Sequence, residues 1–177
     1  MPVALFADVG HAMAHTISAR LADAPMDEVL LSSEMPRTLY QNNEVSPRTH
    51  IIRASGGPVF SLTCTVLSLL WRSLSSKGSL SRDLADASLA GHSFILAGSL
   101  APLPMVDGGT ILKWRLVESG QSSKQADRAV KKQSLYFGAV LLGLGALLGL
   151  LAKRRWAGGL LAACGAASAA ASFGWLK

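Results

Sequence analysis

Residues 134–152, which read SLYFGAVLLGLGALLGLLA, decide the fold. The stretch contains no charged residue and approaches the length of about 20 residues that a helix needs to cross a bilayer. Three basic residues follow at positions 153–155, and a second uncharged run, rich in Ala and Gly, extends from Trp156 to Trp175. The two runs predict a transmembrane helical hairpin, with the basic residues in its turn and the two tryptophans as anchors at the membrane interface.

The composition of the whole chain agrees with a membrane protein. Half of the 177 residues are hydrophobic and only 16% are charged, whereas a soluble domain averages about 25% charged residues. The 17 glycines favour helices that pack closely in lipid. The abundant apolar surface excludes a disordered chain. Cys64 and Cys164 both lie within apolar runs, which excludes a disulfide scaffold.

The net charge of +6 arises from basic residues that lie between or beside the apolar segments. This placement suits contacts with lipid headgroups. The sequence has no zinc-finger spacing and no basic motif interleaved with aromatic residues, so we expect membrane lipid and no nucleic acid as a partner. The basic groups are Arg72/Lys77/Arg82, Lys113/Arg115, Lys124/Arg128/Lys131/Lys132 and Lys153/Arg154/Arg155.

Three further apolar segments precede the hairpin, at residues 2–21, 51–71 and 87–106, and a polar stretch separates the first two. Gly56-Gly57-Pro58 should kink or break the second segment. We therefore predict an all-α, multi-pass integral membrane protein, a bundle of about five membrane segments with a small polar insertion after the first. The expected domains are a membrane core at 1–116, a basic polar linker at 117–133 and the helical hairpin at 134–177.

Ionisable side chains within the predicted membrane segments are candidates for function, because a charge in lipid is costly. Asp8, His11 and His15 lie in the first segment, and Asp107 follows a proline-rich break. The spacing of the histidines places both imidazoles on one helix face, where they can hold a metal ion. With one carboxylate, they form a zinc set with an open position. The same spacing also describes two interfacial polar groups on a short amphipathic helix.

Two stretches resemble motifs of the site-2 protease family of intramembrane zinc metallopeptidases. Residues 99–109, SLAPLPMVDGG, resemble the motif that supplies the carboxylate ligand of zinc, so that Asp107 matches this ligand and Ser99 stands where the family usually has Asn. Residues 53–60, RASGGPVF, resemble the family's Ala-Gly-Gly-Pro segment. The resemblance covers about residues 3–116 and leaves the final hairpin outside.

The first motif of the family, His-Glu-x-x-His, permits two alignments. In the first, which matches more positions and which we favour, Ala7 stands at the first zinc histidine, Asp8 at the catalytic glutamate and His11 at the second histidine. In the second, His11 and His15 are the zinc ligands and Ala12 replaces the glutamate. Both alignments impair proton transfer, because Asp is one methylene shorter than Glu and Ala has no titratable group.

The resemblance implies a membrane-embedded, site-2 protease-like protein that is catalytically degenerate. Asp8 would be a compromised general base, and His11, His15 and Asp107 would be metal ligands if zinc is bound. Such a protein is expected to bind a membrane-protein partner or a peptide. Two alternatives stay open: an active intramembrane zinc metalloendopeptidase, and a structural subunit of a larger membrane complex in which the final hairpin packs against other chains.

Overall fold

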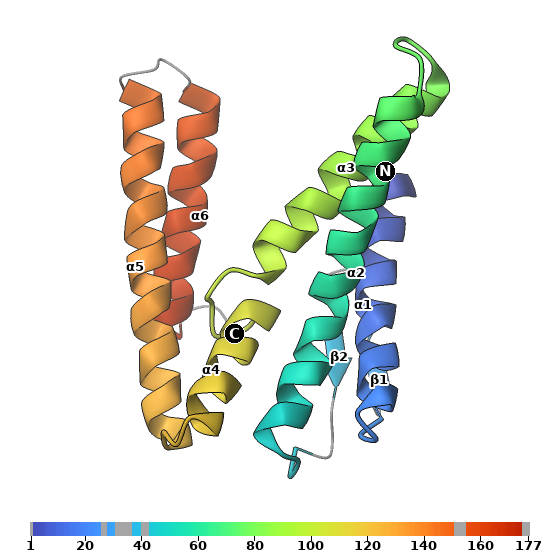
Figure 1. Cartoon of the computed structure of the whole chain (residues 1–177). Coiled ribbons are helices and arrows are strands. Elements are labelled where there is room, and N and C mark those ends of the chain that lie inside the picture. Colours follow the sequence, from blue (N-terminus) through green and yellow to red (C-terminus); the bar gives the residue numbers. More distant parts are fainter. Residues whose placement is uncertain (1, 26–27, 31–36, 40–42, 151–154, 175–177) are drawn as a thin grey trace. The chain divides into compact units, whose positions relative to one another are not determined.

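The computed structural model describes residues 2–25, 28–30, 37–39, 43–150 and 155–174, and these ranges are almost entirely helical (Figure 1). Three of the helices are long and apolar enough to cross a membrane, which confirms the predicted all-α membrane class. Contacts along the chain divide it into two compact units, Met1–Leu100 and Ala101–Lys177. The helices are α1 (Pro2–Leu21), α2 (Pro47–Leu74), α3 (Leu80–Ser99), α4 (Asp107–Glu118), α5 (Ser123–Leu150) and α6 (Arg155–Phe173).

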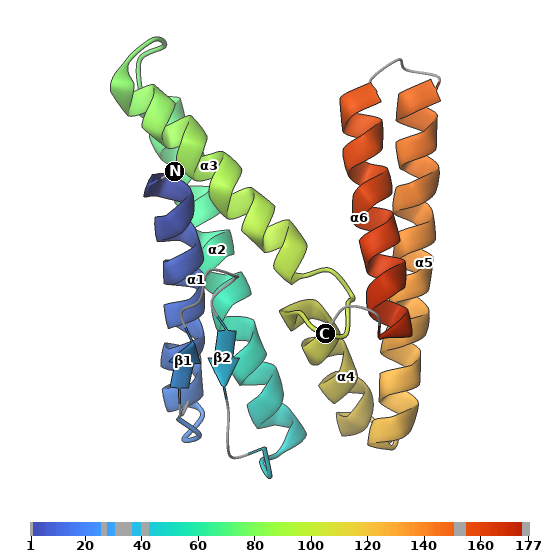
Figure 2. The ribbon, with the colours of Figure 1, turned by 180° about the vertical axis from the view of Figure 1, so that it is seen from behind.

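The first unit consists of α1, α2 and α3, which pack against one another, and a small antiparallel hairpin. The hairpin joins β1 (Glu28–Leu30) to β2 (Arg37–Leu39), with Val29 opposite Thr38. Figure 2 shows this hairpin beside α1, which contacts β2. It forms part of the predicted polar insertion between the first two membrane segments.

Of the kink or break predicted at Gly56-Gly57-Pro58, the break does not occur, because α2 continues through this motif. The N-terminus of α2 is capped by Ser46, whose hydroxyl accepts a hydrogen bond from the Thr49 backbone N–H at 3.1 Å. An internal proline removes one helical hydrogen bond at a cost of about 3 kcal/mol. The packing of α1 against this glycine-containing turn offsets that cost.

A short turn joins α2 to α3, and charged residues of the two helices beside it are paired. The Asp86 carboxylate accepts hydrogen bonds from Arg72 at the end of α2 and from Arg82 on its own helix. The hydrogen bond from Arg72, followed by the positive charges of both arginines, holds the pKa of Asp86 below its usual value. These contacts connect the ends of α2 and α3 at the exposed surface.

In the second unit, α5 and α6 form the predicted helical hairpin. Two buried serines join the helices: the Ser168 hydroxyl donates to the Ser134 carbonyl oxygen at 2.8 Å, and the Ser134 hydroxyl donates to the Ser168 carbonyl oxygen at 3.1 Å. A Cβ atom added at Gly145 would lie 2.7 Å from the Gly158 carbonyl oxygen, so the backbones are in direct contact. Of the predicted basic turn at 153–155, positions 153 and 154 lie outside the described residues, as does the anchor Trp175, whereas Arg155 is the first residue of α6.

The predicted polar linker, residues 117–133, is partly helical, because α5 begins at Ser123. Ala126 and Val130 are buried on this part of α5, which contacts α4. The Lys113 ammonium also lies 2.8 Å from the Asp127 carboxylate and joins the two helices. Apolar contacts on one face thus extend α5 well beyond its uncharged stretch.

Candidate metal centre

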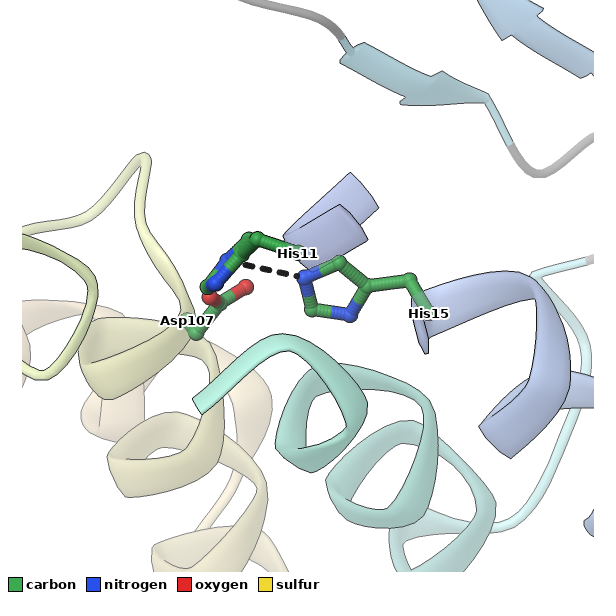
Figure 3. Close-up of side chains that lie close together, drawn as sticks. All are labelled: His11, His15 and Asp107. Carbon is green, nitrogen blue, oxygen red and sulfur yellow. Dashed lines mark hydrogen bonds between the residues drawn. The ribbon is translucent and has the colours of Figure 1, made fainter. Parts of the chain in front are cut away.

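The helix α1 brings His11 and His15 together. The two residues are four positions apart, so successive turns carry them on one face. Their Nε2 atoms lie 3.4 Å from each other, and the rings meet edge to face with centroids 5.1 Å apart (Figure 3). His15 is buried and His11 is half-buried.

The separation of the two Nε2 atoms suits a shared zinc ion. Zinc–nitrogen bonds of about 2.05 Å in tetrahedral geometry place two ligand nitrogens about 3.3 Å apart. The observed 3.4 Å between His11 and His15 matches this value. The pair can therefore supply two adjacent corners of a zinc site without rearrangement.

The opposite ring nitrogens, Nδ1, are held by α2. His15 Nδ1 lies 2.8 Å from the Arg53 carbonyl oxygen. Because a carbonyl only accepts, Nδ1 carries the proton and Nε2 is left with a lone pair, as a metal ligand requires. His11 Nδ1 lies 2.9 Å from the Ser61 hydroxyl, which can donate or accept. Ser61 thus permits either tautomer of His11.

The direction of the hydrogen bond between Ser61 and His11 decides whether the histidine pair can bind a cation. When the Ser61 hydroxyl donates to His11 Nδ1, the proton of His11 is on Nε2 and can be shared with His15. When the hydroxyl instead accepts from Nδ1, both Nε2 lone pairs face each other, an arrangement that a metal ion between them stabilises. Ser61 is completely buried, so water does not replace its hydroxyl.

Replacement of Ser61 by Ala should weaken zinc binding. The loss of a partner behind a metal-ligating histidine typically lowers metal affinity about 10- to 100-fold. We expect a loss in this range, measured by competition with a chelator of known affinity. The Thr63→Ala variant is the control, since the Thr63 hydroxyl bonds only within α2, to the Val59 carbonyl oxygen. Equal affinities of the two variants would contradict this role of Ser61.

The space for the two imidazoles comes from a glycine. A Cβ atom added at Gly57 would overlap the Nε2 atoms of both His11 and His15. The absence of a side chain at this position of α2 therefore leaves the cavity into which the ligand atoms point. One residue earlier, a Cβ atom at Gly56 would meet the backbone carbonyl of Ala14, so Gly56 sets the approach of the helices rather than the cavity.

The two glycines should differ when each is replaced by Ala. We expect Gly57→Ala to remove zinc binding with little loss of stability, because the added methyl displaces imidazole rings, which can rotate away. We expect Gly56→Ala to lower the free energy of unfolding by about 1–3 kcal/mol, because the methyl meets backbone that cannot rotate away. Metal content and denaturation in detergent measure the two effects. If the Gly57→Ala variant still bound zinc, the space beside Gly57 would not be the zinc site.

Asp107, the predicted third ligand, belongs to the second unit as the first residue of α4 (Figure 3). The loop before it contains two prolines and is closed by a hydrogen bond from the Val106 N–H to the Leu103 carbonyl at 3.3 Å. A Cβ atom at Gly109 would overlap the same carbonyl, so the Asp-Gly-Gly sequence is needed for this tight packing. The half-buried Asp107 carboxylate lies at a helix start, where a negative charge is favourable.

The two alignments of the first motif place different residues at the ligand positions of α1. Ala7, at the first ligand position of the preferred alignment, is completely buried, and its methyl packs toward Gly91 of α3. Asp8 is half-buried and makes no hydrogen bond or ion pair within the described residues. The facing pair is His11 and His15, with Ala12 between them in the sequence.

Arg53 is a site residue that the sequence reasoning missed. Its side chain is 2% exposed and donates from Nε and Nη2 to the Ala24 carbonyl oxygen, at 3.0 and 2.7 Å. Its own carbonyl oxygen accepts from His15 and from the Ser18 hydroxyl. Arg53 thereby holds the end of α1 and orients a predicted ligand. A lone arginine in an apolar run was the available signal.

His92 packs against an aromatic ring. It is 2% exposed on α3, and its ring meets the Phe60 ring edge to face, with centroids 5.7 Å apart. Its Nδ1 atom has no hydrogen-bond partner among the described residues. Ser99, at the usual Asn position, donates to the Leu96 carbonyl oxygen of its own helix at 3.2 Å.

Comparisons with known proteins concern the fold. No family model matches the chain, and no curated protein does. Among solved structures, the site-2 protease from Methanocaldococcus jannaschii is similar, with a TM-score of 0.57 and 15% identity over 94% of this chain and 76% of that one. An identity this low concerns the fold alone. Together with the apolar helices, it shows that this membrane protein has a site-2 protease-like fold.

Proposed function

We propose that the chain is a catalytically degenerate relative of the site-2 proteases, which holds zinc and binds a membrane partner or peptide without cleaving it. The observation that carries the proposal is the pair of facing imidazoles with an alanine between them. His11 and His15 keep the spacing of zinc ligands, while Ala12 leaves the position of the proton-transfer group without one.

Asp107 is the proposed third ligand. Two imidazoles and one carboxylate are a set of donors that suits zinc. The similarity to the site-2 protease spans 94% of the chain and so includes both the histidine-bearing and the aspartate-bearing units. Three protein ligands leave one coordination position open, where a bound zinc ion acts as a Lewis acid toward a carbonyl oxygen.

The missing step is proton transfer. Peptide hydrolysis needs a group that takes a proton from water and gives one to the leaving amine, a contribution of about 10²- to 10⁴-fold. Ala12 is 5% exposed and offers no such group. Asp8 lies one turn earlier on α1 and makes no hydrogen bond to either histidine within the described residues. The residues that hold the metal are thus retained, and the residue that moves the proton is absent.

Binding of a peptide requires less than its cleavage. The hairpin of β1 and β2 has two strands, and each outer edge offers backbone N–H and C=O groups to an added strand. We propose that an extended segment of a membrane partner pairs with this hairpin. The affinity would come from main-chain hydrogen bonds, which need no catalytic group.

Metal analysis and a cleavage assay test the proposal together. The purified chain should contain about one zinc ion, lost on replacement of His11, His15 or Asp107 by Ala. Mixed with membrane-segment peptides, it should retain some of them and cleave none. Zinc-dependent cleavage that Asp8→Asn abolishes would instead establish an active endopeptidase. A chain without zinc would leave only the fold in common with the proteases.

A further inference from the structure

The first turns of α5 carry a face of basic side chains that the metal centre does not use. Lys124, Arg128, Lys131 and Lys132 follow one another at intervals of four, three and one residues, so they project within one third of the helix circumference. We call these four residues the cationic face. All four side chains are exposed.

The cationic face is not neutralised by the protein. None of its four residues takes part in an ion pair within the described part of the chain. The neighbouring cations differ: Lys113 lies 2.8 Å from the Asp127 carboxylate, and Arg115 lies 3.2 Å from the Glu118 carboxylate. Four adjacent positive charges therefore face outward without a counter-charge.

This arrangement opposes the stability of α5. Positive charges in the first turns meet the positive end of the helix dipole. Like charges four residues apart, such as Lys124 with Arg128, repel each other as well. The buried face of the same turns, with Ala126 and Val130, already supplies the packing that forms the helix. An external negative charge would offset the cost of the cationic face.

The position of the face along α5 indicates where that negative charge lies. The helix continues without interruption into the uncharged stretch that starts at Ser134. At about 1.5 Å per residue, the cationic face spans about 12 Å and ends about 3 Å before that stretch. The headgroup layer of one leaflet is about 5–8 Å thick, and charges act over about 8 Å beyond it. All four side chains thus fall within reach of lipid phosphates.

An aromatic residue at the boundary agrees with this depth. Tyr136 is 55% exposed, and the Lys132 ammonium lies 5.7 Å from the centre of its ring. Tyrosine is enriched at the level of the headgroups, where its ring is in apolar surroundings and its hydroxyl is wet. Tyr136 and Lys132 would therefore mark the boundary between hydrocarbon and headgroups on this helix.

We propose that the cationic face binds the phosphate groups of anionic phospholipids in the leaflet at which α5 begins. Exposed, unpaired cations attract an anionic surface, and each contributes about fivefold to the association. Zwitterionic phospholipids carry no net charge and should bind more weakly. The proposal concerns α5 alone and does not depend on zinc.

Lipid binding by the full-length protein in detergent tests the proposal. Native mass spectrometry compares the binding of phosphatidylglycerol and phosphatidylcholine to the protein and to two variants. One is Arg128→Gln/Lys131→Gln/Lys132→Gln on the cationic face, and the other is Arg20→Gln/Arg48→Gln/Lys77→Gln elsewhere, at exposed residues that form no ion pair within the described residues. Both variants lose three positive charges, so general electrostatic attraction falls equally in the two. Circular dichroism checks that both remain helical.

The protein and the second variant should prefer phosphatidylglycerol, whereas the first variant should bind it about a hundredfold more weakly. The single variant Lys131→Gln should lose about fivefold, which tests the face even if the triple variant misfolds. Inorganic phosphate at the same concentration should not compete, because it lacks the acyl chains that hold the headgroup at the helix. Three results would overturn the proposal. They are equal losses of phosphatidylglycerol binding in the two triple variants, competition by inorganic phosphate, and preference for an acidic protein segment over lipid.

Discussion

If the chain is degenerate as proposed, replacement of Ala12 by Glu should give it peptidase activity. The new carboxyl group would stand between His11 and His15 at the position of the proton-transfer glutamate in His-Glu-x-x-His. Glutamate is a good helix former, so the helix propensity of α1 is retained. Position 12 is only 5% exposed, so the larger side chain must displace its neighbours, at a cost of about 1–3 kcal/mol. A positioned general base contributes about 10²- to 10⁴-fold to the rate. We therefore expect at least about a hundredfold more cleavage of a membrane-segment peptide, followed by mass spectrometry.

The matched control for this gain is Ala12→Gln. Glutamine has nearly the same shape and volume as glutamate but does not transfer a proton at neutral pH. Ala12→Gln should remain inactive, and so should Ala12→Glu combined with His15→Ala. If glutamate and glutamine at position 12 gave the same rate, the missing proton-transfer group would not be the reason for inactivity.

Replacement of Gly145 by Ala should separate the two helices of the second unit. The added Cβ atom would lie 2.7 Å from the Gly158 carbonyl oxygen and 2.8 Å from the Ala162 backbone nitrogen. Backbone atoms of α6 cannot rotate away as a side chain can, so the helices must move apart. Overpacking of this kind costs about 1–3 kcal/mol. The free energy of unfolding in mixed detergent micelles measures this loss.

Gly143 provides the control on the same helix. A Cβ atom added there meets nothing within 4 Å. Gly143→Ala gains the higher helix propensity of alanine without a clash, so its stability should equal or exceed that of the unchanged chain by up to about 1 kcal/mol. Similar losses in Gly145→Ala and Gly143→Ala would show that α5 and α6 do not pack through these glycines.

The helical hairpin was predictable because its signals are local. A long uncharged run predicts a membrane helix by itself, and small residues such as Gly138 and Gly145 indicate where helices approach. The pairing of His11 with His15 was equally local, because four residues of helix bring them to one face. A polar run also predicted the insertion that contains β1 and β2.

The alignment of the first motif was not decided by local matches. Counting identical positions favours Ala7 and Asp8, whereas the packing of α1 brings His11 and His15 together. The partners that hold these histidines come from α2, from Arg53 and Ser61, which lie 38 and 50 residues away along the chain. Such contacts depend on how two helices pack. Gly57 leaves space for the two imidazoles only because α1 packs against α2 at this position, and no local sequence pattern indicates that packing.

The central claim is that the histidine pair of α1 holds zinc in a chain without a general base. X-ray absorption at the zinc edge on the purified protein examines this most directly. We predict two imidazole nitrogens at about 2.0–2.1 Å, with oxygen ligands completing the coordination, and a loss of one nitrogen in His15→Ala. A spectrum without imidazole ligands, or one that His15→Ala leaves unchanged, would contradict the claim.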